Sequence, residues 1–170
     1  MATLINPGAR GCTDGFTLIE LIVTVAIVAI LATVVLPPLR DLILTQHVRA
    51  GATDLQTALF YARSEAVKRA TNVDVVPVGD DWKSGWKVQL ADGTVLRAQA
   101  ALDDQLTSME VSAGSKITYQ SDGHVSAAPP AMIVRMSSNA NVTARCVVVD
   151  LSGRASVVAD TDGNPSNGCN

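Results

Sequence analysis

The sequence contains few of the side chains on which enzymes and metal sites depend. Its 170 residues include two histidines and three cysteines. His47 falls in an amphipathic helical pattern and His124 in a turn, and neither belongs to a nucleophile elbow or a metal-binding spacing. The cysteines form no CxxC pair and no cluster with histidine, which argues against a zinc site. The sequence gives no support to a catalytic role, and we expect neither an enzyme nor a bound cofactor.

Charged and aromatic side chains are also sparse. The formal net charge is −3, charged residues make up 17% of the chain, and aromatic residues make up 4%. An acidic balance argues against a surface that binds polyanions over its whole extent, although a local basic patch is compatible with it. This composition is typical of a small exported domain rich in β-structure. The length allows one modest domain beyond a membrane segment.

One long apolar run is present, from Phe16 to Leu36, and it is interrupted only by Thr17, Glu20, Thr24 and Thr33. As a helix with a rise of ~1.5 Å per residue it would be about 31 Å long, which is enough to cross a hydrocarbon core of roughly 30 Å. The apolar region of a cleavable signal peptide is shorter, at roughly 7–15 residues. We therefore expect the helix to stay with the mature chain. A carboxylate such as Glu20 is costly near one end of such a segment unless it is paired, so its presence indicates a function.

The rest of the chain has the pattern of an α+β fold. We expect a kink or break at Pro37-Pro38, after which a helical apolar period resumes over residues 39–70. From residue 71 the period changes to two and predicts about seven antiparallel strands, with a turn over 80–86 and a loop over 100–115 that has room for one short strand. The candidate strand segments, of which 125–127 is the shortest, number eight: 72–78, 86–90, 94–99, 116–120, 125–127, 132–137, 145–151 and 155–159.

The segment Gly15-Phe16-Thr17-Leu18-Ile19-Glu20 resembles the processing site of type IV pilins and of type II secretion pseudopilins. The resemblance implies that a prepilin peptidase removes residues 1–15 and methylates the new N-terminus at Phe16. It also implies that Glu20, the fifth residue of the mature chain, pairs with the N-terminal amine of a neighbouring subunit during assembly. Asp14 departs from the family, which often has a basic residue at that position.

Two further segments resemble the GspH/FimT branch of this superfamily, which covers pseudopilin H and the minor pilins FimT and FimU. They are ALFYARSEAVKR at 58–69, and Trp82 with Gly85 and Trp86. The resemblance implies a type IV pilin-like fold, in which residues 16–38 form a transmembrane and assembly helix and residues 39–170 form a periplasmic domain. The expected location is the inner membrane and then a filament. The expected partners are prepilin peptidase, the membrane and other pilins or pseudopilins.

Two functions remain open. The chain could be a minor type IV pilin that is assembled into a pilus or primes it, or it could be pseudopilin H, a tip subunit for protein secretion. Gly153-Arg154 also resembles half of the GRxR motif of FimT-type pilins that bind DNA during natural transformation, although Ser156 occupies the second basic position. Positive charge within reach is sufficient for phosphate contacts. Double-stranded DNA is therefore a candidate partner, with Gly153, Arg154, Arg145 and Arg135 as candidate contacts and Arg97 and Lys116 as supplements.

The cysteines suggest one disulfide. Cys12 lies in the predicted leader, which leaves Cys146 and Cys169 in an exported domain. A bond between them would close a loop of 24 residues and contribute about 3 kcal/mol; two unpaired thiols are the alternative. The nearby Asp160–Asn164 segment alternates acidic and amide side chains as calcium loops do, but it lacks their distal glutamate. We therefore interpret it as an ordinary turn and expect no metal.

Overall fold

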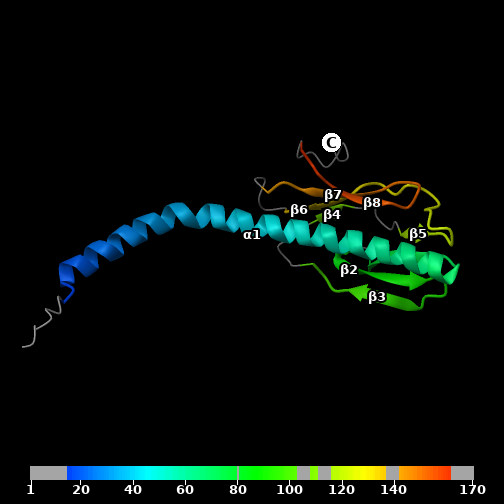
Figure 1. The fold of residues 1–170 in the computed structure, drawn as a ribbon, viewed down its shortest axis with the longest axis horizontal. Coiled ribbons are helices and arrows are strands. Elements are labelled where there is room, and N and C mark those ends of the chain that lie inside the picture. The colour runs from blue at the N-terminus through cyan, green and yellow to red at the C-terminus, as the bar shows by residue number, and fades with distance from the viewer. Residues whose placement is uncertain (1–14, 80, 103–107, 111–115, 137–141, 162–170) are drawn as a thin grey trace, which may run out of the picture. The chain divides into compact units, whose positions relative to one another are not determined.

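A computed structural model of the chain describes residues 15–79, 81–102, 108–110, 116–136 and 142–161 (Figure 1), with the backbone alone described for 34–38 and 108–110. The chain divides into two compact units, residues 1–39 and residues 40–170, and each is considered by itself. Within the described residues there are one helix and eight strands.

The helix α1 spans Leu18–Arg69 and has a cap at each end. At the start, Thr17 accepts a hydrogen bond from the Glu20 backbone N–H through its Oγ1 at 3.3 Å, which is the geometry of an N-cap residue. At the end, the Thr71 N–H donates to the Ala66 carbonyl at 3.2 Å, and Ala70 has a φ of 50°. This is a Schellman motif with alanine in the left-handed position that glycine usually occupies.

Of the kink or break predicted at Pro37-Pro38, the break is wrong, because the helical backbone continues through both prolines. A proline removes one hydrogen bond and displaces the carbonyl four residues before it. A long helix can absorb that loss locally while neighbouring turns keep their hydrogen bonds. The proline pair therefore interrupts the hydrogen-bond ladder of α1 and not the element.

The predicted apolar stripe of the second half of α1 is confirmed. Its members recur every three or four residues and are almost inaccessible: Val48, Ala52, Leu55, Leu59, Ala62 and Ala66. Such spacing places them on one helix face. Among the described residues no buried apolar side chain precedes Leu44, so the core belongs entirely to the unit formed by residues 40–170.

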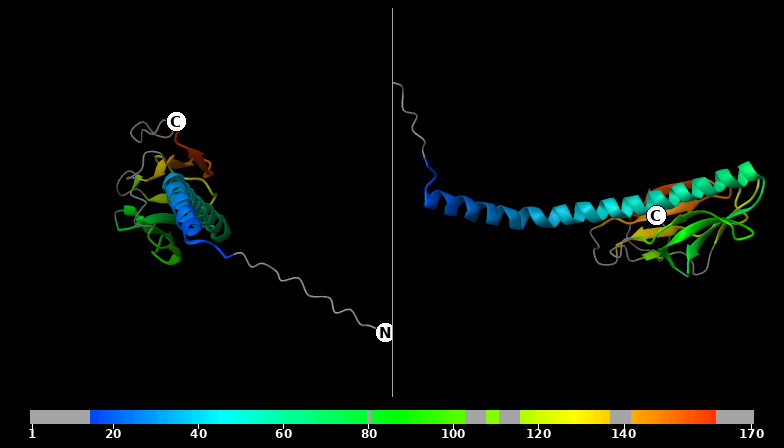
Figure 2. Two further views of the ribbon diagram at one scale, coloured as in Figure 1. Left: turned by 90° about the vertical axis from the view of Figure 1, so that its left-hand side faces the viewer. Right: turned by 90° about the horizontal axis from the view of Figure 1, so that it is seen from below.

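Two antiparallel sheets supply the other side of this core. The first sheet has the order β3-β2-β1-β5, with β1 at Val73–Val78, β2 at Asp81–Leu90, β3 at Val95–Gln99 and β5 at Ile117–Tyr119. The second has the order β4-β6-β7-β8, with β4 at Ser108–Glu110, β6 at Met132–Arg135, β7 at Arg145–Val149 and β8 at Ala155–Ala159. Side chains from both sheets join the α1 stripe in one apolar cluster, and Figure 2 shows both sheets against the same length of helix. The predicted α+β fold is confirmed.

Two local predictions are wrong. Strand β2 begins at Asp81, within the turn predicted over 80–86, because Val78 pairs with Asp81 while Pro77 pairs with Trp86. The residues between them bulge out of the ladder, and a bulge keeps a strand paired through a sequence that looks like a turn. The strand predicted at 125–127 is reduced to a single bridge between Val125 and Tyr119.

Candidate functional site

The predicted processing site is exposed and free of packing constraints. A Cβ atom added to Gly15 would meet no atom within 4 Å, and Phe16 is 78% exposed. Nothing in the described structure therefore requires glycine at position 15. A glycine without a local structural role is compatible with recognition by another protein.

Glu20 lies in the first turn of α1 with its side chain exposed. Thr17 and Glu20 have the spacing of a capping box, in which the carboxylate at the third helical position favours the helix start. The positive end of the helix dipole also favours a carboxylate there. Glu20 thus has a local role in the free chain, in addition to the assembly role that the sequence predicts.

The first half of α1 is apolar on every side and has no core. Every described side chain from Phe16 to Thr33 is exposed, including eleven large apolar ones from Phe16 to Leu31. Two of the threonines in this stretch satisfy their hydroxyls within the helix, since Thr24 donates to the Leu21 carbonyl at 2.8 Å and Thr33 donates to the Ile30 carbonyl at 2.7 Å. Apolar surface of this extent normally marks an interaction site.

Across the described residues, no helix segment is both long enough and apolar enough to cross a membrane.

Arg154 is exposed on the tight turn between β7 and β8, where its backbone N–H donates to Asp150 Oδ1 at 3.0 Å. Gly153, beside it, is buried and has a φ of +77°, and a Cβ there would lie 2.1 Å from the Gly123 carbonyl oxygen. The turn is packed so closely against the neighbouring turn that only glycine fits. The glycine of the Gly153-Arg154 pair therefore has a structural explanation that does not involve DNA.

The structure does not bring the predicted DNA contacts together. Arg145 is the first residue of β7, at the opposite end of that strand from Arg154. Arg145 pairs with Val134, which faces the α1 core, whereas Arg135 is the next residue of β6 and so points to the other face of the sheet. Arg154, Arg145 and Arg135 thus do not form one surface.

The two supplementary cations each have a partner within the domain. Arg97 is on β3 with its guanidinium 5.8 Å from the centre of the Tyr61 ring. Lys116 donates to Asp74 at 2.8 Å, beside Thr118, which donates to the other oxygen of the same carboxylate at 2.6 Å. Double-stranded DNA binding stays a prediction that depends on Arg154.

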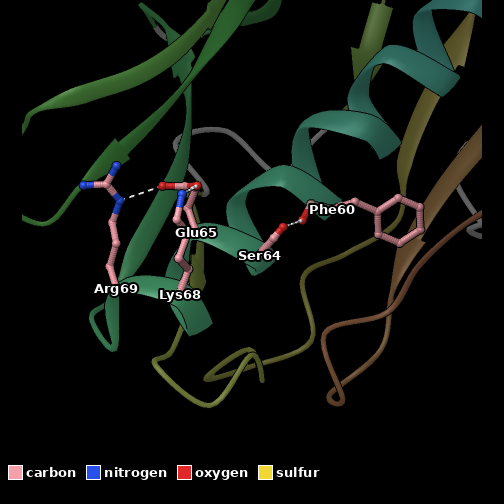
Figure 3. Close-up of polar contacts among 5 residues, drawn as sticks. All are labelled: Phe60, Ser64, Glu65, Lys68 and Arg69. Carbon is pink, nitrogen blue, oxygen red and sulfur yellow. Dashed lines mark hydrogen bonds and ion pairs between the residues drawn. The ribbon is translucent and has the colours of Figure 1, made fainter.

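The end of α1 contains an ion-pair cluster that sequence reasoning did not identify, although it lies within the 58–69 segment. Glu65 is buried, and its Oε2 accepts a hydrogen bond from Arg69 Nε at 2.6 Å while its Oε1 lies 3.4 Å from Lys68 Nζ (Figure 3). The hydrogen bond from Arg69 lowers the pKa of Glu65, and Lys68 adds to the effect. The spacing of four residues between Glu65 and Arg69 is the signal that could have predicted this pair. The cluster fixes the last turn of the helix.

Cys146 is fully buried on β7 and is disulfide-bonded. Its predicted partner Cys169 lies outside the described residues, so the Cys146–Cys169 pairing stays a prediction. The segment considered as a calcium loop is described only as far as Thr161, and no group of three metal-ligating side chains occurs in the part of the chain that the structure describes. His124 Nδ1 lies 3.3 Å from Asp122 Oδ2 on an exposed turn.

Comparison with known proteins gives two family matches. The model of the family "Type II transport protein GspH" matches residues 51–153, and the prokaryotic N-terminal methylation motif matches residues 12–36. No curated protein matches the chain.

The fold is similar to that of the type IV minor pilin FimU of Pseudomonas aeruginosa in two crystal forms. The first has a TM-score of 0.59 at 23% identity and covers 70% of this chain and 96% of FimU. The second has a TM-score of 0.54 at 22% identity and covers 68% of this chain and 99% of FimU.

Proposed function

The chain belongs to the GspH family, whose model matches 103 of its 170 residues, and on this premise we propose that it is a minor pilin of a type IV pilus. In this proposal the chain is inserted into the inner membrane with residues 40–170 in the periplasm. Prepilin peptidase then cuts after Gly15, and the mature chain joins a filament with other pilins. The methylation motif over residues 12–36 supports the processing step.

The observation that carries the proposal is the apolar surface of the first half of α1. The domain core begins at Leu44, while the large apolar side chains from Phe16 to Leu31 are all exposed. A helix that is apolar on every side is stable only when something apolar surrounds it. A lipid bilayer before assembly and the helices of other subunits after assembly would both provide that environment. The internal hydrogen bonds of Thr24 and Thr33 suit either one, since backbone and hydroxyl groups must be satisfied internally in lipid.

Glu20 has a defined task in this proposal. In an apolar surrounding its carboxylate is costly unless a cation pairs with it. The free amine of a processed Phe16 on a neighbouring subunit is such a cation, and it becomes available only after the leader is removed. The ion pair can therefore form only with a processed neighbour, and it would fix the position of one subunit along the next in the filament.

A type IV pilus is preferred over a secretion pseudopilus because both similar structures are of a minor pilin of that machine. The alternative is pseudopilin H, and the description of the matching family model supports it. Deleting the gene for the chain separates the two, since loss of surface pili supports the first function and loss of protein secretion with intact pili supports the second.

The assembly role can be tested by comparing Glu20→Gln with Glu20→Ala in the full chain in its host. Glutamine can accept the side-chain hydrogen bond of a capping box as glutamate can, but it removes the charge, so the ion-pair role predicts that both variants fail to enter filaments. A role limited to the helix cap predicts that only Glu20→Ala fails. Asp54→Asn is a matched control, because Asp54 is an exposed carboxylate of the same helix within the unit 40–170. Normal incorporation of Glu20→Gln would contradict the proposal.

A further inference from the structure

A pocket of about 210 Å³ opens on the unit 40–170 where α1 meets β7 and β8. Arg49 and Thr53 line it from the helix, Arg145 lines it from β7, and Val157 lines it from β8. These elements lie side by side in both views of the fold (Figures 1 and 2). Two arginines from separate elements, one on the helix and one on a strand, therefore line the same opening.

Arg145, one of the residues that line this pocket, has an unsatisfied donor. Its Nε atom is buried and, within the described part of the chain, has no hydrogen-bond partner. Arginine remains protonated under all ordinary conditions, so the N–H cannot escape its need for an acceptor by losing a proton. A buried polar group left without a partner in a native structure calls for an explanation, such as an absent ligand.

The other lining residues define the chemistry of that ligand. Arg49 is exposed and adds a second positive charge, and none of the described residues that line the pocket is acidic. The Thr53 hydroxyl donates to the Arg49 carbonyl at 2.8 Å, so its proton is already used and the donors available to a ligand are those of the guanidiniums. Two guanidiniums suit an oxoanion, which they can bind through several charge-assisted hydrogen bonds. Val157 provides an apolar wall beside them.

We propose that this pocket binds the carboxylate of an aspartate or glutamate side chain from a neighbouring filament subunit. The inference rests on the proposed function, since the partner is another subunit. The apolar wall fits the methylene groups that precede a side-chain carboxylate. A nucleic acid backbone would need further cations along its path, but Arg135 faces the other side of the sheet and Arg154 lies at the far end of β7. The net charge of −3 also disfavours a polyanion.

The ligand chemistry is tested on the full chain in detergent micelles by NMR of the arginine Nε–H groups. Sodium propionate is titrated against sodium chloride at equal ionic strength. The proposal predicts a saturable shift of the Arg145 Nε–H with propionate alone, and binding roughly tenfold weaker in Arg49→Gln. Lys87→Gln, a matched loss of charge on the other sheet, should bind as the wild type does. No saturable shift, or a duplex DNA that binds this pocket more tightly than propionate does, would overturn the proposal.

Whether the carboxylate comes from a neighbouring filament subunit is tested in the host, by measuring how much of each variant enters filaments. Arg145→Met should be depleted from filaments and Arg145→Lys partly so, while both fold as well as the wild type. If the wild type enters filaments and Arg145→Met enters equally, the pocket proposal fails and the proposed function stands. If the wild type itself does not enter filaments, the proposed function is refuted, and so is the proposal that the pocket binds a carboxylate of a neighbouring subunit.

Discussion

Replacing Gly153 by alanine should destabilise the domain strongly, through two separate costs. The first is the left-handed backbone at φ +77°, which costs a residue with a Cβ roughly 1–2 kcal/mol. The second is the contact of 2.1 Å with the Gly123 carbonyl oxygen, which a backbone must shift to relieve. Forced packing of this kind costs about 1–3 kcal/mol. The sum is roughly 2–5 kcal/mol, a large part of the stability of about 5–15 kcal/mol that is typical of natural domains.

Gly93→Ala is the matched control for this prediction. Gly93 has a similar φ of +88°, but a Cβ there would meet no atom within 4 Å. The control therefore carries the backbone cost alone, and the difference between the two variants isolates the collision between the turns.

Urea unfolding of the full chain in detergent, followed by tryptophan fluorescence, measures both variants. Trp82 and Trp86 are buried in the domain core, so their fluorescence reports on the unit that contains both glycines. We expect the Gly153→Ala midpoint to lie well below that of Gly93→Ala. Equal midpoints would refute the argument that the two turns are packed in contact and would restore a purely functional explanation of Gly153.

Three further predictions concern the helix end and the β7–β8 turn. Ala70→Gly should raise the free energy of unfolding by about 0.5–1 kcal/mol in the same urea assay, because the relief of the left-handed alanine, roughly 1–2 kcal/mol, exceeds the extra backbone entropy that glycine loses on folding, roughly 0.5–1 kcal/mol; an unchanged or lower value would contradict the Schellman geometry. The hydrogen bond from Arg69 lowers the pKa of Glu65 below the usual value of 4.5, so the ion pair contributes its full stabilisation above pH 4.5. This stabilisation is lost as the pH falls through the lowered pKa of Glu65. Glu65→Gln should accordingly have a lower urea midpoint than the wild type at neutral pH, with a gap that narrows in acid; a constant gap would contradict this. If duplex DNA binds, Arg154→Ala should weaken binding and reduce the salt slope by about 1, whereas Arg145→Ala should not; no binding by the wild type at low salt would remove DNA as a partner.

The sequence predicted those parts of the fold that depend on local pattern. The stripe from Val48 to Ala66 is spaced for one helix face, and the period of two over 86–90 and 94–99 predicted the paired parts of β2 and β3. The start of β2 could not be predicted in this way, because it depends on the pairing of Val78 with Asp81 across a bulge. The continuity of α1 through Pro37-Pro38 could not be predicted either. Helix propensity gives the energetic cost of each proline, but it does not say whether the neighbouring turns of a long helix keep their hydrogen bonds.

The candidate sites were predictable where they lie in one continuous segment. Gly15, Phe16 and Glu20 are close in sequence, so their pattern alone identifies them. Arg49 and Arg145 are 96 positions apart in the chain, and only the packing of α1 against β7 brings them to one pocket. The reverse holds for Arg154 and Arg145, which are close in sequence but are separated by the length of a strand. Helix packing decides the first outcome and strand direction the second, and both are tertiary properties.

Processing after Gly15 and incorporation into a filament can be measured together by mass spectrometry of the chain in filaments sheared from the host cells. We predict a chain that begins at a methylated Phe16, present in the filament fraction and absent from that fraction in Glu20→Ala cells. A chain that keeps residues 1–15 and is found only in membranes would contradict it.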